Sequence, residues 1–198
     1  KFLVGDIGNT LTKIAIVNSN YKIIKSYNFE TSKIQKKKFF NLFFIKILKN
    51  NLQKKILFSS VVPKALIKIK KLLNKKNYST YEIKNLKISK IIKLNIDDYR
   101  ELGSDRIANA ISAHYKYKKD CLIIDFGTAT TFDVIKKNGI YDGGVIAPGI
   151  NLSKNNLNKF TALLPIFNLK SNFVSYGKNT KDALNAGFIW GYQGLINN

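Results

Sequence analysis

The sequence has very few residues that could form covalent or metal crosslinks, with one cysteine, one histidine and no methionine among 198 residues. Because Cys121 stands alone within an apolar run, it cannot form an internal disulfide, and we expect a buried thiol in a reducing compartment. His114 has no second histidine and no nearby cysteine, so a metal-binding or nucleophilic role is not expected. These scarcities exclude a disulfide-rich secreted scaffold, and they favour a cytoplasmic protein.

Long hydrophobic runs are also lacking. The most apolar segment, residues 39–48, contains Asn41 and Lys46 and is far shorter than the roughly 20 residues of a membrane-spanning helix. The apolar residues 2–4 are followed at once by Gly5 and Asp6, which is unlike the layout of a signal peptide. The sequence therefore predicts a soluble protein with no membrane partner.

Acidic residues are scarce, with 12 Asp and Glu against 34 Lys and Arg, which gives a formal net charge of +22. Such a charge alone would suggest nucleic acid or an anionic membrane as a partner. The lysines, however, are spread along the whole chain, and arginine occurs only at Arg100 and Arg106. A specific nucleic-acid reader would usually concentrate arginine on one face, because the guanidinium fork matches phosphates and guanine edges. We therefore expect weak, salt-sensitive binding to polyanions and no specific nucleic-acid partner.

An acidic glycine turn occurs twice, as DIGNTLTK at residues 6–13 and as DFGTATTF at residues 125–132. Each copy lies between two apolar runs, so each predicts a strand, a tight turn and a second strand. A single Asp-x-Gly is ordinary turn chemistry. Two copies in the same setting, 119 residues apart (125 minus 6), indicate a duplicated domain with two phosphate-binding hairpins.

The residue types in these turns suit a phosphorylated ligand. Gly8 and Gly127 can take positive φ and lack a Cβ, so backbone N–H groups can approach a phosphate closely. Lys13 can offset the charge that builds on a transferred phosphoryl group, and Asp6 and Asp125 can hold a metal ion or its water shell. Hydroxyl donors are added by Thr10, Thr12, Thr128, Thr130 and Thr131.

Residues 103–113 read GSDRIANAISA and predict a helix with an apolar stripe at Ile107, Ala108 and Ile111. Ser104 can cap this helix, which places Asp105 and Arg106 in its first turn. An aspartate there is common for a structural reason, because the positive end of the helix stabilises the anion. The functional alternative is that Asp105 accepts a hydroxyl proton while Arg106 binds a carboxylate, as in the phosphorylation of a small hydroxy acid. The physics of the sequence leaves both alternatives open.

Between the two turns the sequence alternates between strand and helix patterns. We expect strands at 21–28 and 55–62, helices at 33–54 and 65–76, and a later helix at 182–196. Strands followed by alternating helices and strands indicate an α/β architecture.

Seven motifs, in order, resemble those of the type III pantothenate kinases: DIGNTLTK, SSVVP at 59–63, LGSDRIANA at 102–110, DFGTATTFDV at 125–134, GGVIAPG at 143–149, LP at 164–165 and YGKNT at 176–180. They run along essentially the whole chain. The resemblance implies an α/β, duplicated actin-like (ribonuclease H-like) two-domain kinase fold with mixed sheets flanked by helices. We place the N-terminal domain at residues 1–117 and the C-terminal domain at residues 118–198.

The resemblance also implies an ATP-dependent enzyme that phosphorylates pantothenate to 4'-phosphopantothenate, the first step of coenzyme A biosynthesis. It implies Mg2+ and a monovalent cation, K+ or NH4+, as cofactors, and a homodimer that completes the pocket. Asp105 would be the general base, and Asp125 would bind the monovalent cation. ATP would be bound by Asp6, Ile7, Gly8, Asn9, Thr10, Leu11, Thr12, Lys13 and Thr128. Pantothenate would be bound by Gly103, Ser104, Asp105, Arg106 and Thr180.

Two departures from the family pattern keep other hypotheses open. Ile96 and Tyr99 stand where the family usually has a tyrosine and a proline. Family members also continue through a further strand and helix that carry a TGG motif, so we expect the C-terminal domain to be truncated here. A catalytically degenerate relative that acts as a regulatory or transcriptional accessory protein is the second hypothesis. A basic nucleic-acid-binding protein that merely keeps the fold is the third.

Overall fold

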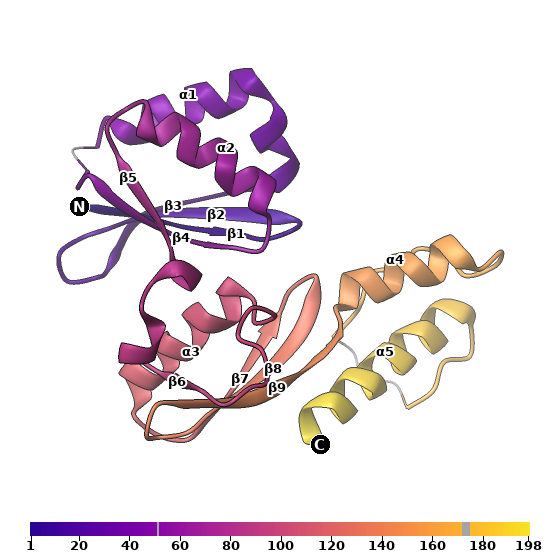
Figure 1. The fold of residues 1–198 in the computed structure, drawn as a ribbon. Helices are drawn as coiled ribbons and strands as arrows, with labels where there is room; N and C mark the ends of the chain where they lie inside the picture. Colours follow the sequence, from indigo (N-terminus) through magenta and orange to yellow (C-terminus); the bar gives the residue numbers. More distant parts are fainter. Residues whose placement is uncertain (51, 172–174) are drawn as a thin grey trace. The chain divides into compact units, whose positions relative to one another are not determined.

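The computed structural model describes residues 1–50, 52–171 and 175–198. The chain divides into two compact units (Figure 1): unit 1 contains residues 1–123 and 132–144, and unit 2 contains residues 124–131 and 145–198. The predicted domain limits, 1–117 and 118–198, remain a prediction, because this division reflects packing within the described residues and does not address a duplication.

Unit 1 is built on a five-stranded mixed sheet in the order β3-β2-β1-β4-β5. Its strands are β1 (Phe2–Ile7), β2 (Leu11–Val17), β3 (Ile23–Glu30), β4 (Lys55–Ser60) and β5 (Ser79–Glu82). β1 pairs antiparallel with β2, its hairpin partner, and parallel with β4, which the chain reaches through a crossover connection. β3 and β4 correspond to the strands predicted at 21–28 and 55–62.

Two helices, α1 (Lys37–Leu48) and α2 (Pro63–Asn74), lie on the same side of this sheet (Figure 1). They correspond to the helices predicted at 33–54 and 65–76, but α1 is shorter than predicted. A 3₁₀ helix, η1 (Thr31–Gln35), precedes α1, and the extended backbone of Lys36, with ψ 99°, separates the two. The hydrophobic pattern continues across Lys36, which is why the sequence predicted one longer helix.

The main core lies between these helices and the sheet. Alternate residues of the strands point into it, among them Leu3 and Ile7 of β1 and Ile56 and Phe58 of β4. They pack against apolar side chains of both helices, such as Phe44. Because side chains alternate along a strand, the residues between them point to the opposite face of the sheet, where the candidate site lies.

Gly5 of β1 lies on the core face of the sheet, against Phe58 of β4. A Cβ there would lie 2.5 Å from the Phe58 ring and 2.8 Å from Ile14 Cδ1. Because core side chains are close-packed, we expect Gly5→Ala to lower the free energy of unfolding by about 1–3 kcal/mol, measurable by urea unfolding. Gly194→Ala is the matched control: a Cβ at this helical position meets nothing within 4 Å, so alanine should stabilise by about 0.4–1 kcal/mol. An unchanged unfolding midpoint in Gly5→Ala would contradict the tight packing.

Unit 1 has a second apolar core, to which α3 (Ser104–Tyr117) contributes buried side chains. Two 3₁₀ turns, η2 (Ile83–Asn85) and η3 (Ile88–Lys90), lead from β5 to the short strand β6 (Lys93–Leu94). Ile107 of α3 is fully buried in this core, so the helix predicted at 103–113 and its apolar face are confirmed.

The second sheet has the order β6-β9-β8-β7, with β7 (Cys121–Phe126), β8 (Ala129–Ile135) and β9 (Ile140–Pro148). In unit 2, β9 is followed by α4 (Ile150–Phe160) and α5 (Thr180–Asn197), the latter matching the helix predicted at 182–196. Asn179 caps α5, because its side-chain oxygen accepts the Asp182 N–H at 3.0 Å. Two mixed sheets flanked by helices confirm the predicted α/β fold class.

Candidate functional site

The first acidic glycine turn joins β1 to β2 through residues 8–10, with Asn9 and Thr10 at the tip of the loop. The Gly8 N–H donates to the Leu11 carbonyl at 3.0 Å and closes the loop. Both tip residues are exposed, whereas Ile7 is buried in the core. The turn therefore presents a short polar loop on a rigid strand pair.

Neither turn glycine uses the positive φ that glycine allows. Among the described glycines, positive φ occurs at Gly139 and Gly143, and not at Gly8 or Gly127. Each turn glycine uses its own N–H to close its turn, Gly8 to Leu11 and Gly127 to Ala129, so an ordinary backbone conformation suffices. Close approach still favours glycine at position 8, because a Cβ there would lie 3.0 Å from the Leu11 carbonyl oxygen.

Thr12 lies inside the protein with an exposed fraction of 0%. Thr31 Oγ1 donates to the Gly8 carbonyl at 2.6 Å, and the Oγ1 atoms of Thr12 and Thr31 lie 3.0 Å apart. A hydroxyl has one hydrogen, so Thr12 is the donor in this pair. The Thr12 hydroxyl thus braces the turn through Thr31, and its predicted contact with ATP stays a prediction.

Four polar residues form a row across the face of the first sheet that points away from α1 and α2. The strand registers pair Asn28 with Lys13, Lys13 with Asp6, and Asp6 with Ser59. Residues paired in this way on one face lie about 5 Å apart. All four line a cavity of about 410 Å³ whose other walls are largely apolar. A lysine and an aspartate are therefore neighbours in a concave site of unit 1.

Ser59 is the buried member of this row. Its exposed fraction is 8%, and Ser59 Oγ has no hydrogen-bond partner within the described residues. A buried hydroxyl without a partner costs about 1–3 kcal/mol, so this group points to a partner supplied by a ligand or by water. Ser59 belongs to the SSVVP motif, for which the sequence suggested no role.

The start of α3 differs from the prediction in one respect. Ser104 does not cap the helix: Gly103 occupies the N-cap position, and no side chain caps it. The Ser104 hydroxyl is 3.1 Å from Glu82 Oε1 and donates to it, and Ser104 is almost fully buried. This carboxylate draws the hydroxyl away from the helix N-terminus.

Asp105 lies in the first turn of α3, as predicted. Its Oδ1 accepts the backbone N–H of Arg106 at 2.8 Å. Ala108, three residues later on the same helix face, lines the 410 Å³ cavity. Asp105 is therefore on the cavity side of α3, in the same unit as Asp6 and Lys13.

Arg106 is paired with Asp133 of β8 in the interior of unit 1. Nε and Nη2 of Arg106 lie 2.7 and 2.6 Å from Asp133 Oδ1, and the Tyr141 hydroxyl donates to the same oxygen at 2.7 Å. Burial, helped by this hydrogen bond, raises the pKa of Tyr141 far above its usual value, so the phenol stays protonated as a donor. The predicted role of Arg106 as a carboxylate ligand remains a prediction.

The second acidic glycine turn lies in unit 2, between β7 and β8. Asp125 and Thr128 are both exposed there. The Gly149 N–H donates to the Thr128 carbonyl at 3.0 Å, and a Cβ at Gly149 would collide with the carbonyl oxygens of Gly127 and Thr128. Because Gly149 immediately precedes α4, the N-terminus of this 11-residue helix lies beside the turn.

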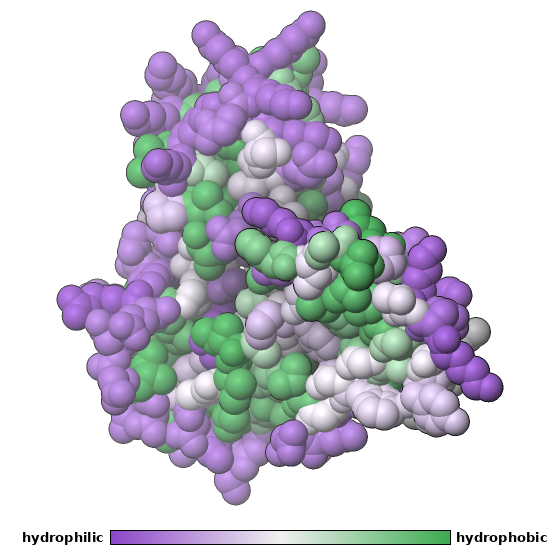
Figure 2. Space-filling view, turned by 90° about the vertical axis from the view of Figure 1, so that its right-hand side faces the viewer, coloured by the Kyte–Doolittle hydropathy of each residue, from purple (hydrophilic) through white to green (hydrophobic). Residues whose placement is uncertain are grey.

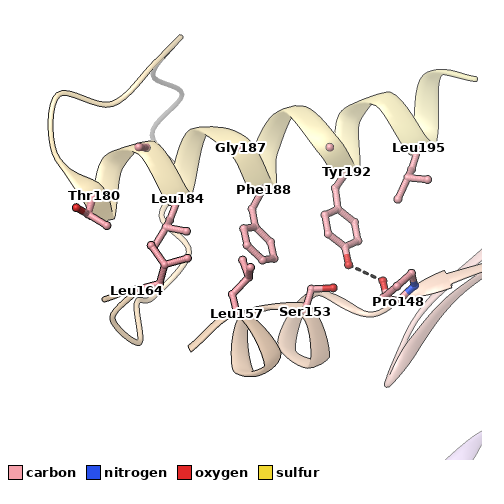
Figure 3. A pocket seen from close by; sticks show the side chains of 12 residues that line it. Pro148, Ser153, Leu157, Leu164, Thr180, Leu184, Gly187, Phe188, Tyr192 and Leu195 are labelled. Carbon is pink, nitrogen blue, oxygen red and sulfur yellow. Dashed lines mark hydrogen bonds between the residues drawn. The ribbon is translucent and has the colours of Figure 1, made fainter. Parts of the chain in front are cut away.

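Thr180 is the exposed first residue of α5 and lines one end of a cavity of about 570 Å³ in unit 2. Figure 3 shows Leu184, Phe188 and Tyr192 projecting from one face of α5 toward α4. The Tyr192 hydroxyl donates to the Pro148 carbonyl at 2.6 Å. The cavity walls are mostly apolar. The side chain of Thr180 is one of the few polar groups that line the cavity.

The predicted site residues thus form two sets. The first turn and the GSDR segment belong to unit 1, and Asp125, Thr128 and Thr180 belong to unit 2. Ser59, Asp133 and Tyr141 were not predicted as site residues. Ser59 and Asp133 do occur within quoted motifs, which is the one sequence signal that could have drawn attention to them.

In the described ranges, no group of three or more His, Cys, Asp or Glu side chains is arranged to hold a metal ion. Mg2+ does not require such a group, because it is commonly bound by one or two carboxylates together with substrate phosphates and water. Asp6 is a suitable carboxylate, and the Ser59 hydroxyl in the same row could contact a metal-bound water or a phosphate. The donors present therefore fit a metal that arrives with a nucleotide.

The surface carries both hydrophilic and hydrophobic side chains, as the face drawn in Figure 2 shows. Several large apolar residues of unit 2 are exposed, including Phe160, Leu163, Ile166 and Trp190. No helix within the described residues combines the length and the apolar character that crossing a membrane requires.

The chain combines an α/β fold of two mixed sheets with two acidic glycine turns and an aspartate at a helix start. The profile of the type III pantothenate kinase family matches residues 2–198. The chain is 47% identical over 198 residues to the type III pantothenate kinase of Pelagibacter ubique, covering 99% of this chain and 78% of that relative. The corresponding enzyme of Fervidobacterium nodosum is 36% identical over 197 residues, covering 98% and 77%. This chain belongs to the type III pantothenate kinase family.

A solved structure shares the fold along nearly the whole chain. It is that of a conserved Campylobacter jejuni protein classed with the Baf family of transcriptional activators, with a TM-score of 0.62 and 26% identity. The similarity covers 99% of this chain and 78% of that chain. The regulatory class of that protein describes the neighbour, whereas the family match and the relatives above carry kinase names.

Proposed function

We propose that this chain transfers the γ-phosphoryl group of ATP to the hydroxyl group of pantothenate, giving 4'-phosphopantothenate in the first step of coenzyme A biosynthesis. One observation carries the proposal beyond the family match. Asp105 lies in the first turn of α3, three residues before Ala108, which lines the same cavity as Lys13 and Asp6. A base, a cation and a metal-binding carboxylate are therefore all available within unit 1.

The first turn, residues 6–13, would bind the phosphates of ATP. The exposed Asn9-Thr10 loop offers polar groups, and Lys13 offers a positive charge from the adjoining strand. Asp6 would hold the hydrated Mg2+, with the Ser59 hydroxyl as a further hydrogen-bond donor. When bound, Mg2+ would neutralise phosphate charge as the phosphoryl group transfers. The chain's own contribution is to position the donors and to stabilise charge.

Asp105 would act as the general base. Its carboxylate would accept the proton of the attacking hydroxyl, a role typically worth about 10²–10⁴-fold in rate. The backbone at Gly103 and Ser104 and the guanidinium of Arg106 would orient pantothenate, with Arg106 binding its carboxylate. Phosphoryl transfer of this kind depends on positioning and charge, so no covalent intermediate on the protein is needed.

The second turn and α5 would supply the remaining contacts. Thr128 would contact the nucleotide, with the N-terminus of α4 beside it as a further source of positive potential. Asp125 would bind a monovalent cation, and Thr180 would contact pantothenate. We further propose a homodimer and a cytoplasmic location, both of which follow the family.

The direct test is product formation by the purified chain with ATP, Mg2+ and K+, followed by mass spectrometry of 4'-phosphopantothenate. Product that depends on both ATP and pantothenate would support the kinase. A folded chain that binds ATP but forms no product would instead favour a degenerate accessory protein. That alternative is not favoured at present, because Asp6, Asp105 and Asp125 are all retained.

We expect Asp125→Asn to raise the K+ concentration needed for half-maximal activity by at least about tenfold, since losing even an outer partner of a metal site often costs that much. Titrating initial rates with K+ against a background of choline chloride measures this shift. Asp97→Asn removes an exposed carboxylate outside both cavities and should leave the titration unchanged. Equal K+ dependence in Asp125→Asn and the original chain would refute the cation role.

A further inference from the structure

A buried carboxylate holds the guanidinium of Arg106 by one edge. Nε and Nη2 both contact Asp133 Oδ1, at 2.7 and 2.6 Å. Neither of these two contacts uses Nη1. The guanidinium group is planar and rigid, so the contacts of Asp133 with Nε and Nη2 set the direction of its remaining N–H donors.

Two residues of β9 complete the enclosure. The Arg106 guanidinium carbon lies 5.9 Å from the centre of the Tyr141 ring, and the Tyr141 hydroxyl donates to Asp133 Oδ1 at 2.7 Å. Gly144 leaves space for the guanidinium, because a Cβ there would lie 2.5 Å from Nη2 and would collide with the Phe132 carbonyl oxygen. Residues from α3, β8 and β9 thus enclose the side chain of Arg106.

A buried charged pair is not explained by stability alone. Asp133 is 0% exposed, and the side chain of Arg106 is 13% exposed. The cost of removing both charges from water can exceed their attraction, and similar apolar residues are often at least as stable. Asp133 Oδ2 is also buried without a partner among the described residues, which adds to that cost. The energetic cost of this arrangement points to a functional role.

We infer that Asp133, braced by Tyr141, is a positioning residue that fixes the Arg106 guanidinium for the carboxylate of the substrate. This inference rests on the proposed function. Asp133 touches neither substrate nor nucleotide in this proposal and acts only through Arg106. Holding the guanidinium in place before the substrate arrives reduces the entropy lost on binding, so the effect should appear in substrate affinity.

The test compares pantothenate with its alcohol analogue, in which CH2OH replaces the carboxylate. We expect Asp133→Asn to raise the KM for pantothenate by about tenfold, a typical cost of removing a group that orients a ligand-binding side chain. The kcat should change little, and kcat/KM for the alcohol should stay within about twofold, because the alcohol offers no carboxylate to Arg106. Arg106→Ala should give the same selective pattern with a larger change.

Tyr141→Phe provides a milder variant if Asp133→Asn does not fold. It keeps the ring and the charged pair and removes one hydrogen bond to Asp133 Oδ1. It should raise the KM for pantothenate in the same selective way, by a smaller factor. Parallel losses with both substrates, or no change with either, would overturn the positioning role. Failure of the unaltered chain to phosphorylate pantothenate would instead overturn the proposed function, and with it this inference.

Discussion

Asp105→Asn should reduce the rate of 4'-phosphopantothenate formation by about 10²–10⁴-fold, the usual range for a general base. The substitution preserves shape, because the asparagine carbonyl can still accept the Arg106 N–H that Asp105 Oδ1 accepts at 2.8 Å. What is lost is the negative charge and the ability to take a proton. The helix start should weaken by only about 0.3–1 kcal/mol.

Measuring kcat, KM and ATP affinity separately makes this result specific. ATP affinity should remain nearly intact in Asp105→Asn, since the phosphate contacts are assigned to residues 6–13. Asp97→Asn is the matched control, an exposed aspartate just before α3 that lines neither cavity. Turnover in Asp105→Asn close to that of the control would show that Asp105 serves the helix N-terminus and not catalysis.

Local pattern was enough to predict most of the fold. The apolar runs in β1 and β4 and the apolar stripe of α3 are properties of short segments, so each element could be inferred without its partner. The 3₁₀ helix before α1 was missed because the hydrophobic spacing continues through Lys36, where only the backbone changes. Boundaries of this kind depend on packing that the sequence pattern does not contain.

Site residues could be predicted only where a local sequence motif indicates their chemistry. Asp6 and Lys13 flank a recognisable glycine turn and Asp105 stands at a helix start, where charged groups are commonly functional. Ser59 and Asp133 lie within strands, where a single polar residue has no local signal. Their interest comes from strand register, burial and partners distant in the sequence, which only the folded chain reveals.

Two possibilities that the sequence offered at the site are not used, for the same reason. Ser104 can cap a helix and glycine can take positive φ, and both expectations consider only the residue and its near neighbours. In the fold, the Ser104 hydroxyl donates to Glu82, and Gly8 uses its N–H to close its hairpin. In each case a competing hydrogen bond decided the geometry. That competition cannot be judged from residue preference alone.

Lys13→Ala is expected to lower kcat by about 10²–10³-fold, the typical cost of removing one group that stabilises charge in a transition state. Lys13 lies opposite Asp6 across the β1–β2 pair and lines the 410 Å³ cavity. Its ammonium can therefore reach the phosphoryl group only if ATP is bound at the adjoining turn. Because Lys13 is exposed on the sheet, its removal should leave the core intact.

The ratio of the effects on kcat and on the KM for ATP identifies what Lys13 does. A fall in kcat with an equal fall in kcat/KM means that the interaction forms in the transition state, whereas a rise in KM alone means uniform binding of the nucleotide. Lys22→Ala removes an exposed lysine from the β2–β3 loop and controls for the general loss of positive charge. If Lys22→Ala lowers kcat as much as Lys13→Ala does, the high net charge of the chain, and not a placed cation, accounts for the effect. A loss confined to Lys13→Ala assigns phosphoryl charge stabilisation to this one side chain.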